Sequence, residues 1–236
     1  MAVSFVLPCY NPPDGWHENI FATYLTLSKT IGEQFQLIIV FDGVSASVTG
    51  EQVTFLKNNI PALKIIDYPV NKGKGHAIRQ GVSASTGDII IYTDLDFPYT
   101  VESMLAIYTN LVNNNCDVAV GVKGSNYYNN VPFMRRIISR YLRFMTGMVL
   151  SMPITDTQCG LKGFKVTAKQ LFLKTTINRY LFDLEFIRNC FRSKKYRVLA
   201  VPVTLNEKVH FRNMDYRILM PEMLNFIKLL FNKTHE

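Results

Sequence analysis

Short runs of apolar, largely β-branched residues recur along the chain. Most carry no charge inside the run, which is typical of strands that are buried on both faces of a sheet. The six runs are VSFVLP (3–8), QLIIVF (36–41), LKIIDY (63–68), DIIIYT (88–93), DVAVGV (117–122) and RVLAVPV (197–203). We expect a buried strand at each of them.

Segments of helical length and period separate the early runs, at about 17–31, 51–59, 74–85 and 101–114. Each is flanked by Gly, Pro, Asn or Asp, which commonly bound helices. Because strands and helices alternate, we expect an α/β fold with a mostly parallel central sheet and helices on both faces. After residue 123 the pattern predicts a long basic helix near 131–150, a loop, helices near 167–174 and 182–194, one more strand and a C-terminal helix near 216–231.

The 236 residues are 48% hydrophobic, so the chain can bury a sizeable core, and we expect a single domain over residues 1–236. Its net charge of +8 is unevenly spread, because residues 1–122 sum to −5 and residues 123–236 to +13. Such a basic half indicates an anionic partner, such as a phosphate-rich ligand or a lipid surface. The alternative is a merely solvated basic face.

Four cysteines lie far apart and form no CxxC pair, which indicates neither a zinc site nor a disulfide framework. The N-terminus has no basic segment before its apolar run, and no later stretch offers eighteen charge-free apolar residues. We therefore expect a cytoplasmic protein that neither is exported nor spans a membrane.

Polar residues follow each of the first four predicted strands. In an open parallel sheet, ligands bind beyond the carboxyl ends of the strands. The segments at these ends are PCYN (8–11), FDG (41–43), YPVNKGKG (68–75) and TDLD (93–96). Each carries a group that can contact a nucleotide.

Asp94 and Asp96 are one residue apart, so in an extended segment both carboxylates would point to the same face. Their repulsion is relieved if a cation joins them. Mg²⁺ or Mn²⁺ takes few carboxylate ligands and completes its shell with substrate phosphates, which suits a nucleotide diphosphate. Two solvated loop aspartates remain the alternative interpretation of this triplet.

Glycines and lysines open the predicted helix in NKGKGHAIRQG (71–81). Free backbone N–H groups and the helix dipole favour anions at such a position. The stretch does not have the spacing of a P-loop, so it predicts either a basic, glycine-rich phosphate site or an ordinary helix start.

These motifs, together with DTQCGLKGF (156–164) and RYLFDLEF (179–186), carry a resemblance to a known family. Taken in order, they resemble an inverting family 2 glycosyltransferase with a GT-A fold. The last two are similar to those of the polyprenyl-phosphate, or dolichyl-phosphate, glucosyl- and mannosyltransferases. The resemblance covers about residues 3–203 and implies a nucleotide-sugar-binding half over 1–122 and an acceptor-binding half over 123–236.

The resemblance also implies roles for residues of the donor half. Lys208 and Arg212, after the last strand, would fold over the diphosphate, unless they are only surface charges. Nucleotide-sugar binding would involve Pro8, Tyr10, Asp42, Lys74, Asp94, Leu95, Asp96 and Lys208. Among these, Asp42 would accept a base N–H, Lys74 would face the diphosphate, and Asp94 and Asp96 would bind Mg²⁺ or Mn²⁺. Relatives of the mannosyl branch place a glutamine where this chain has Pro98, which favours a glucose-like donor, UDP-glucose over GDP-mannose.

The acceptor implied by the resemblance is a polyprenyl phosphate. Arg136, Arg140 and Arg143 share one face of the predicted basic helix, and arginine binds phosphate through a planar fork. We expect them, with Gln158, to hold the acceptor phosphate, unless they form only a solvated stripe. Asp156 lies in the loop that lines the reaction centre in relatives, so we assign it and Asp96 active-site roles.

Three alternatives to this function stay open. A family 2 enzyme that acts on a saccharide hydroxyl in cell-surface polysaccharide synthesis would need a general base, for which Asp156 is the candidate. A sugar-1-phosphate nucleotidyltransferase would carry its Gly-rich signature after the first strand, where this chain has PCYNPPDG. A non-catalytic membrane- or nucleic-acid-binding protein is the third, although no nucleic-acid-reading module is present.

The last predicted helix, 216–231, is apolar on one side with lysines at its edge. Such a helix either packs on its own domain or lies in a membrane interface. We expect packing, with peripheral contact at the cytoplasmic membrane face as the alternative.

Overall fold

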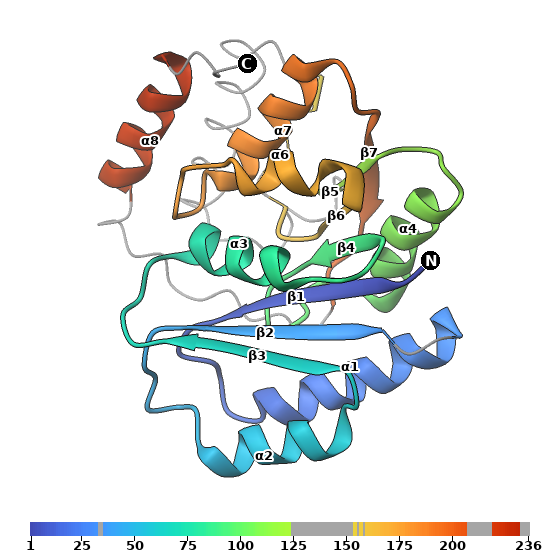
Figure 1. The fold of residues 1–236 in the computed structure, drawn as a ribbon, viewed down its shortest axis with the longest axis vertical. Helices are drawn as coiled ribbons and strands as arrows, with labels where there is room; N and C mark the ends of the chain where they lie inside the picture. Colours follow the sequence, from blue (N-terminus) through green and yellow to red (C-terminus); the bar gives the residue numbers. More distant parts are fainter. Residues whose placement is uncertain (33–34, 124–152, 155, 158, 207–218, 232–236) are drawn as a thin grey trace.

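The computed structural model describes residues 1–32, 35–123, 153–154, 156–157, 159–206 and 219–231. The predicted basic helix near 131–150 lies outside these residues. A seven-stranded sheet runs through the centre of the described part, in the order β3-β2-β1-β4-β6-β5-β7 (Figure 1). Its strands are β1 (Val3–Cys9), β2 (Gln36–Asp42), β3 (Leu63–Tyr68), β4 (Ile89–Tyr92), β5 (Val118–Lys123), β6 (Lys162–Lys165) and β7 (Val198–Val203).

Helices cover both faces of the sheet, as the alternating pattern predicted (Figure 1). On one face lie α1 (Trp16–Ile31), α2 (Gly50–Asn59) and α4 (Val101–Val112). On the other lie α3 (Lys74–Ala84), α6 (Lys169–Leu173) with the short helix η2 (Val166–Ala168) before it, α7 (Phe182–Ser193) and α8 (Leu219–Phe231). The α/β fold with a mostly parallel sheet between two helical layers is therefore confirmed.

Alternation of side chains along the strands builds one core on each face of the sheet. Phe5 and Leu7 of β1 face α1, whereas Val6 between them faces α3. All three are at most 1% exposed, because successive side chains of a strand point to opposite faces and both faces are covered. This explains the uninterrupted apolar runs of the inner strands.

The prediction that every strand is buried on both faces is wrong for β3 and β7. Both lie at the ends of the sheet, and most of their residues are partly exposed or exposed. An edge strand has a neighbour on one side only, so helices cover it less completely. The charged residues of β3, Lys64 and Asp67, are accordingly exposed.

The strand β6 was predicted as part of a loop. Its sequence, KGFK, has neither a continuous apolar run nor a period of two. It pairs antiparallel with both β4 and β5, whose backbones would otherwise lack a partner between them. Gly163 at its centre is required by packing, because a Cβ there would lie 2.8 Å from side chains of Ile107 and Leu111.

Capping residues define several helix boundaries. Thr49 and Gln52 form a reciprocal capping box at the start of α2, and Thr100 accepts a hydrogen bond from the Ser103 N–H at the start of α4.

Within the described part of the chain, none of the helices combines the length and the apolarity needed to cross a bilayer.

The topology brings the predicted site residues to one edge of the sheet. β1, β2, β4 and β5 run in the same direction, so their carboxyl ends meet there. Because β6 runs in the opposite direction, its first residue, Lys162, lies at this same edge opposite Tyr92.

Candidate active site

Asp42 ends β2 and holds the turn that leads into α3. Its two carboxylate oxygens accept hydrogen bonds from the backbone N–H groups of Lys72 (2.7 Å) and Gly73 (2.9 Å). Its carbonyl accepts another from the Asn71 side chain at 3.1 Å. The carboxylate is 3% exposed, so the structure gives Asp42 a part in fixing this turn. Its predicted contact with the nucleotide base stays a prediction.

The glycines of NKGKG make room for the backbone of the segment between α6 and α7. A Cβ on Gly73 would lie 2.5 Å from the Asn178 carbonyl, and one on Gly75 would lie 2.6 Å from the Ile177 carbonyl. The Asn178 carbonyl accepts the His76 N–H at 3.2 Å. Several N–H groups at this helix start thus bind protein oxygens, which favours the interpretation as a helix start over a phosphate cradle.

Arg79 and Glu185 fix the same segment from two sides. Arg79 of α3 donates to the Ile177 carbonyl at 2.7 Å and to the Asn178 side chain. Glu185 of α7 accepts from the backbone N–H groups of Thr176 and Ile177, both at 2.9 Å. Segment 176–178 is therefore held rigidly beside the start of α3.

Lys74, the first residue of α3, forms an ion pair with Asp94 after β4. Burial alone would lower the pKa of the Lys74 ammonium, but the nearby carboxylates of Asp94 and Asp183 outweigh it and raise the pKa. Lys74 is therefore positively charged at neutral pH. Its charge lies at the carboxyl edge of the sheet, and its predicted contact with a diphosphate stays a prediction.

Asp94 and Asp96 lie in a turn, so the prediction of an extended segment is wrong. The Phe97 N–H donates to the Asp94 carbonyl at 3.1 Å, and Phe97 has a φ of 46°. Asp96 is exposed, and its carbonyl accepts from the Asn19 side chain at 3.3 Å. The Leu95 side chain is buried in the core, so a predicted ligand contact there falls to its backbone.

Gly160 of the DTQCG segment lies against the Asp94 carboxylate. A Cβ at this position would be 2.5 Å from Asp94 Oδ2, so a larger residue here would displace the carboxylate. The Gly160 N–H donates to the Tyr99 hydroxyl at 2.9 Å, and Tyr99 is buried. The glycine is therefore fixed in place by Tyr99.

The pair Asp94 and Asp96 suits a hard divalent cation in its chemistry. Both supply carboxylate oxygen, Asp94 is partly exposed and Asp96 is exposed. Among the residues described, no cluster of three or more His, Cys, Asp or Glu side chains is placed to hold a metal. A cation bound here would thus complete its shell with other oxygens, as Mg²⁺ and Mn²⁺ do with phosphates.

The segment after Asp96 is tied to the end of β7. The Pro98 carbonyl accepts the Asn206 N–H at 2.9 Å, and the Asn206 side chain donates to the Phe97 carbonyl at 2.7 Å. Pro98 is buried. The position at which some relatives carry glutamine is therefore part of a fixed backbone link in this chain.

Asp156 is buried beside the end of β5. Its Oδ2 accepts the Lys123 N–H at 2.9 Å, and the carboxylate is 6% exposed. Its other oxygen, Oδ1, has no hydrogen-bond partner among the described residues. A buried carboxylate oxygen is costly unless a hydrogen-bond donor contacts it, so we expect a ligand, water or a residue outside the described ranges to contact this atom.

The remaining predicted site residues fall into two groups. Pro8 lies within β1 opposite Val40, and the Tyr10 side chain, 51% exposed, lies just beyond the end of that strand. The others lie outside the described residues; they are Arg136, Arg140, Arg143, Gln158, Lys208 and Arg212.

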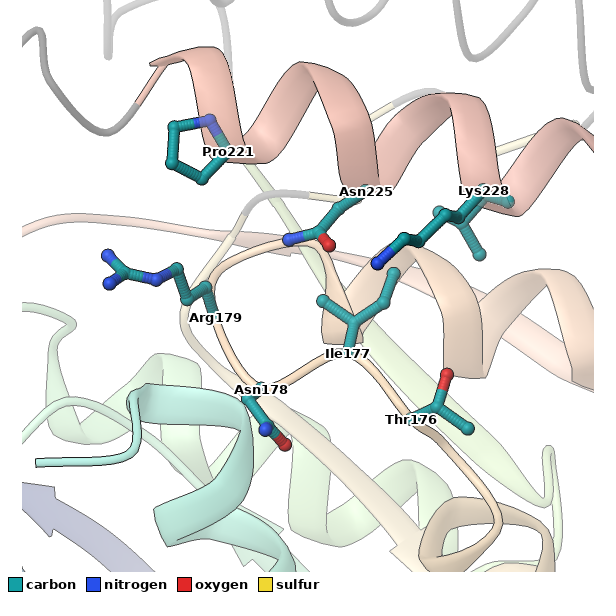
Figure 2. Close-up of a pocket in the computed structure, with 8 residues that line it drawn as sticks. Thr176, Ile177, Asn178, Arg179, Pro221, Asn225 and Lys228 are labelled. Carbon is teal, nitrogen blue, oxygen red and sulfur yellow. The ribbon is translucent and has the colours of Figure 1, made fainter.

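A pocket of about 360 Å³ lies between α8 and segment 176–179, and none of the predicted site residues lines it (Figure 2). Asn225 and Lys228 extend from α8 toward the segment, above Ile177 and Thr176. One side of α8 packs on the domain through Phe226 and Leu229, which confirms the expected packing of this helix.

Sequence reasoning missed a buried charged group under the site. Lys162 is fully buried, and its ammonium lies 2.9 Å from Asp183 Oδ2. Tyr92 donates its hydroxyl to Asp183 Oδ1 at 2.5 Å. The signal was present in GLKGF and FDLEF, where a lysine and an aspartate interrupt otherwise apolar stretches, but only the fold shows that they meet.

The family described as Glycosyl transferase family 2 matches residues 4–172 of the chain. Dolichyl-phosphate beta-glucosyltransferase ALG5C of Trichomonas vaginalis is 27% identical over 217 residues, which make up 86% of this chain and 64% of that protein. The dolichyl-phosphate beta-glucosyltransferase of Drosophila melanogaster is 23% identical over 202 residues, or 79% of this chain and 62% of that protein. The chain thus spans less than two thirds of the length of these relatives.

Among solved structures, glucosyl-3-phosphoglycerate synthase from Mycobacterium tuberculosis is similar to this chain. Its complex with Mn²⁺, UDP and glucosyl-3-phosphoglycerate superposes with a TM-score of 0.64 at 16% identity, over 97% of this chain and 78% of that one. Its complex with Mn²⁺, UDP-glucose and glycerol 3-phosphate gives a TM-score of 0.63 over the same shares. At this identity the likeness shows the fold alone, which is the GT-A fold.

Proposed function

The chain belongs to glycosyltransferase family 2, and we propose that it transfers a hexose, with inversion, from a nucleotide diphosphate sugar to a polyprenyl phosphate. The observation that carries the proposal is the Lys74–Asp94 pair beside Gly160, at the edge of the sheet where Asp156 also lies. This arrangement offers a positive charge, one partly exposed and one exposed carboxylate, and a buried carboxylate at the same edge of the sheet. These are the groups that a diphosphate leaving group and its cation require.

The donor is proposed to bind along residues 1–122. Pro8, Tyr10 and Asp42 lie at the ends of adjacent strands and would contact the nucleoside, while Lys74 faces the diphosphate. UDP-glucose is the donor of choice, since the fold neighbour was crystallised with it and the similar relatives are named glucosyltransferases. GDP-mannose is the alternative donor.

Asp94 and Asp96 are proposed to hold Mg²⁺ or Mn²⁺. When bound, the cation would offset the negative charge that develops on the departing diphosphate. Gly160 contributes by letting the Asp94 carboxylate lie close to the backbone of the DTQCG segment, and Tyr99 contributes by holding Gly160. Lys74 orients the other Asp94 oxygen and adds a second positive charge at the leaving group.

The acceptor is proposed to bind along residues 123–236. A phosphate monoester has its second pKa near 6, so its oxygen is already anionic at neutral pH and needs no general base. That oxygen attacks the sugar C1 as the bond from C1 to the diphosphate breaks, and the electron pair leaves with the nucleoside diphosphate. Arg136, Arg140, Arg143 and Gln158 are proposed to hold the acceptor phosphate, with Lys208 near the diphosphate.

A specific observation favours a second candidate, transfer to a saccharide hydroxyl. Such a reaction needs a base, and Asp156 Oδ1 is a buried carboxylate oxygen free of partners in the described residues. In this case Asp156 would accept the hydroxyl proton as the new bond to C1 forms.

The outer side of α8 supports peripheral contact with a membrane, where a polyprenyl phosphate resides. Met223 and Leu224 are 53% and 54% exposed, and Ile227 is also exposed. Lys228 is exposed and lies where this side meets the pocket. An exposed apolar side bordered by a lysine is suited to the interface of an anionic bilayer.

The test measures transfer from radiolabelled UDP-glucose and, separately, GDP-mannose to a short-chain polyprenyl phosphate, with Mn²⁺ or with EDTA. We expect a glycolipid that depends on the cation, and its loss in Asp96→Ala. Asp67→Ala, which removes an exposed carboxylate of β3, is the matched control. Transfer that persists in EDTA, or full activity of Asp96→Ala, contradicts the mechanism.

Charge reversal at Arg136 and Arg140 separates the two acceptors. Transfer to polyprenyl phosphate is expected to fall, whereas a saccharide-specific enzyme would be little affected. The second candidate would be supported by a wild-type protein that transfers to a saccharide and not to the lipid. In that case Asp156→Asn should abolish the transfer to the saccharide.

A further inference from the structure

A charged network lies in the core directly beneath the candidate site. Lys162 is 0% exposed and lies between Asp183 of α7 and the ring of Tyr92, 5.8 Å from the ring centroid. Asp183 also accepts the Tyr92 hydroxyl. The network thus joins β6, α7 and β4, three elements that are distant in sequence.

Lys162 also binds the segment that borders the site. Its ammonium donates to the Cys159 carbonyl, one peptide before Gly160. The neighbouring backbone is held by the Gly160 N–H on Tyr99 and by the Leu161 carbonyl, which accepts the Gly121 N–H at 3.0 Å. Lys162 is therefore the contact that fixes this turn from the core side, while Tyr99 and Gly121 fix its flanks.

Stability alone does not account for a fully buried lysine. Removing an ion pair from water costs more than its attraction usually returns, and apolar replacements of similar volume are often as stable. A buried pair does fix the conformation of the groups it binds, provided each partner is satisfied. Here the satisfied group is the Cys159 carbonyl, in the turn that contains Gly160. Gly160 in turn packs so closely on Asp94 that a Cβ there would lie 2.5 Å from Asp94 Oδ2.

We propose that Lys162 is a positioning residue, which holds the Cys159–Gly160 turn so that Asp94 keeps its place at the site. Asp183 in turn holds Lys162 and lies near Lys74, so the two aspartates and two lysines alternate from the core to the edge of the sheet. The consequence for catalysis rests on the proposed function, whereas the effect on the turn does not.

Two double variants isolate the hydrogen bond to the Cys159 carbonyl. Both Lys162→Met/Asp183→Asn and Lys162→Gln/Asp183→Asn remove the buried charges and leave Tyr92 an acceptor. Only the glutamine variant restores a donor for the carbonyl. Lys165→Met is the matched control, because Lys165 lies at the other end of β6 and pairs with Asp117 and Asn114 away from the site.

Amide hydrogen exchange gives the readout that needs no substrate. In the methionine variant we expect faster exchange at Gly160 and Leu161 with unchanged exchange in β1 and β2, and near-wild-type exchange in the glutamine variant and in Lys165→Met. Exchange that rises equally throughout the sheet, or no change at Gly160, overturns the proposal. If neither double variant folds, hydrogen exchange in the wild-type protein is the test. We expect the Gly160 amide to exchange only through global unfolding, and exchange through local opening overturns the proposal.

Kinetics give the second readout. The methionine variant is expected to lose about 10²-fold in kcat with little change in the donor KM, since a small misplacement of reacting groups has this cost. The glutamine variant should recover most of the loss. If the methionine variant shows faster exchange at Gly160 but keeps the wild-type kcat, Lys162 has no part in catalysis. If the wild-type protein itself is inactive, the proposed function is refuted, whereas the effect of Lys162 on the turn is still measured by hydrogen exchange.

Discussion

Lys74 and Asp94, which are twenty residues apart, form an ion pair across the edge of the sheet, with the ammonium on Asp94 Oδ1 and Gly160 beside Oδ2. The pair places one positive and one negative group of the candidate site in contact before any ligand binds. Because Lys74 is positively charged at neutral pH, it can stay at the diphosphate throughout a reaction without gaining or losing a proton.

Replacing Lys74 by methionine should lower kcat by about 10²- to 10³-fold, the usual cost of losing one group that stabilises developing negative charge. Lys74→Arg keeps the charge and should retain part of the activity. Initial rates at saturating donor measure the effect. Lys72→Met is the control, since the Lys72 ammonium lies over the Tyr68 ring, 5.5 Å from its centroid, and its contact with Asp42 is made by the backbone N–H, which the substitution keeps. Equal losses in both variants would argue against a specific role of Lys74.

Adding one methyl group at Gly160 should disturb the cation site without changing any charge. In Gly160→Ala the Cβ lies 2.5 Å from Asp94 Oδ2, so the carboxylate must move. We expect weaker Mn²⁺-dependent binding of UDP by calorimetry and a fall in activity of at least about tenfold. Gly50→Ala, where no atom lies within 4 Å of the added Cβ, is the control. Unchanged binding in Gly160→Ala would show that Asp94 is not constrained there.

Removing the Asp42 carboxylate should destabilise the turn before α3. Asp42→Ala leaves the N–H groups of Lys72 and Gly73 without their acceptors in a partly buried position, at a cost of about 1–3 kcal/mol. Urea unfolding measures the loss. The exposed carboxylate of Asp67 is the comparison, and Asp67→Ala should unfold like the wild type. A small effect of Asp42→Ala on stability would mean that water replaces the carboxylate.

Glu222 should make the stability of the protein depend on pH. Burial raises the pKa of its carboxyl above the usual 4.5 despite hydrogen bonds from the N–H groups of Leu181 and Tyr180. Folding therefore favours the protonated form, and this contribution is complete below pH 4.5 and is lost as pH rises through the raised pKa. Glu222→Gln mimics the protonated form. Its melting temperature should therefore be higher than that of the wild type at pH 7 and equal to it near pH 4.

Thermal unfolding at the two pH values tests this prediction. Glu102→Gln, at an exposed position in the first turn of α4, serves as the control. A Glu222→Gln variant that melts below the wild type at pH 7 would contradict the sign derived from burial.

Much of the fold was predictable because local patterns determined it. The runs at β1, β2 and β4 are mostly apolar, and each intervening helix has its own period and its own boundary residues. The strand β6 was not predictable, because KGFK becomes a strand only when β4 and β5 lie on either side of it. The outer positions of β3 and β7 were missed for a similar reason, since the order of strands in a sheet is a property of the whole chain.

The candidate site divides in the same way. The sequence by itself determined which chemical groups follow the strands, such as Asp42, Lys74 and Asp94, because polar residues directly after buried runs stand out. Only the tertiary structure decided what those groups contact. The backbones of Gly73 and Gly75 pack against Ile177 and Asn178, and Gly160 packs against the Asp94 carboxylate. Lys162 forms an ion pair with Asp183 in the core. Hydrophobic period and turn chemistry act over a few residues and can be read along the chain, whereas these contacts join residues about twenty to a hundred positions apart and exist only once the sheet has brought its strands together.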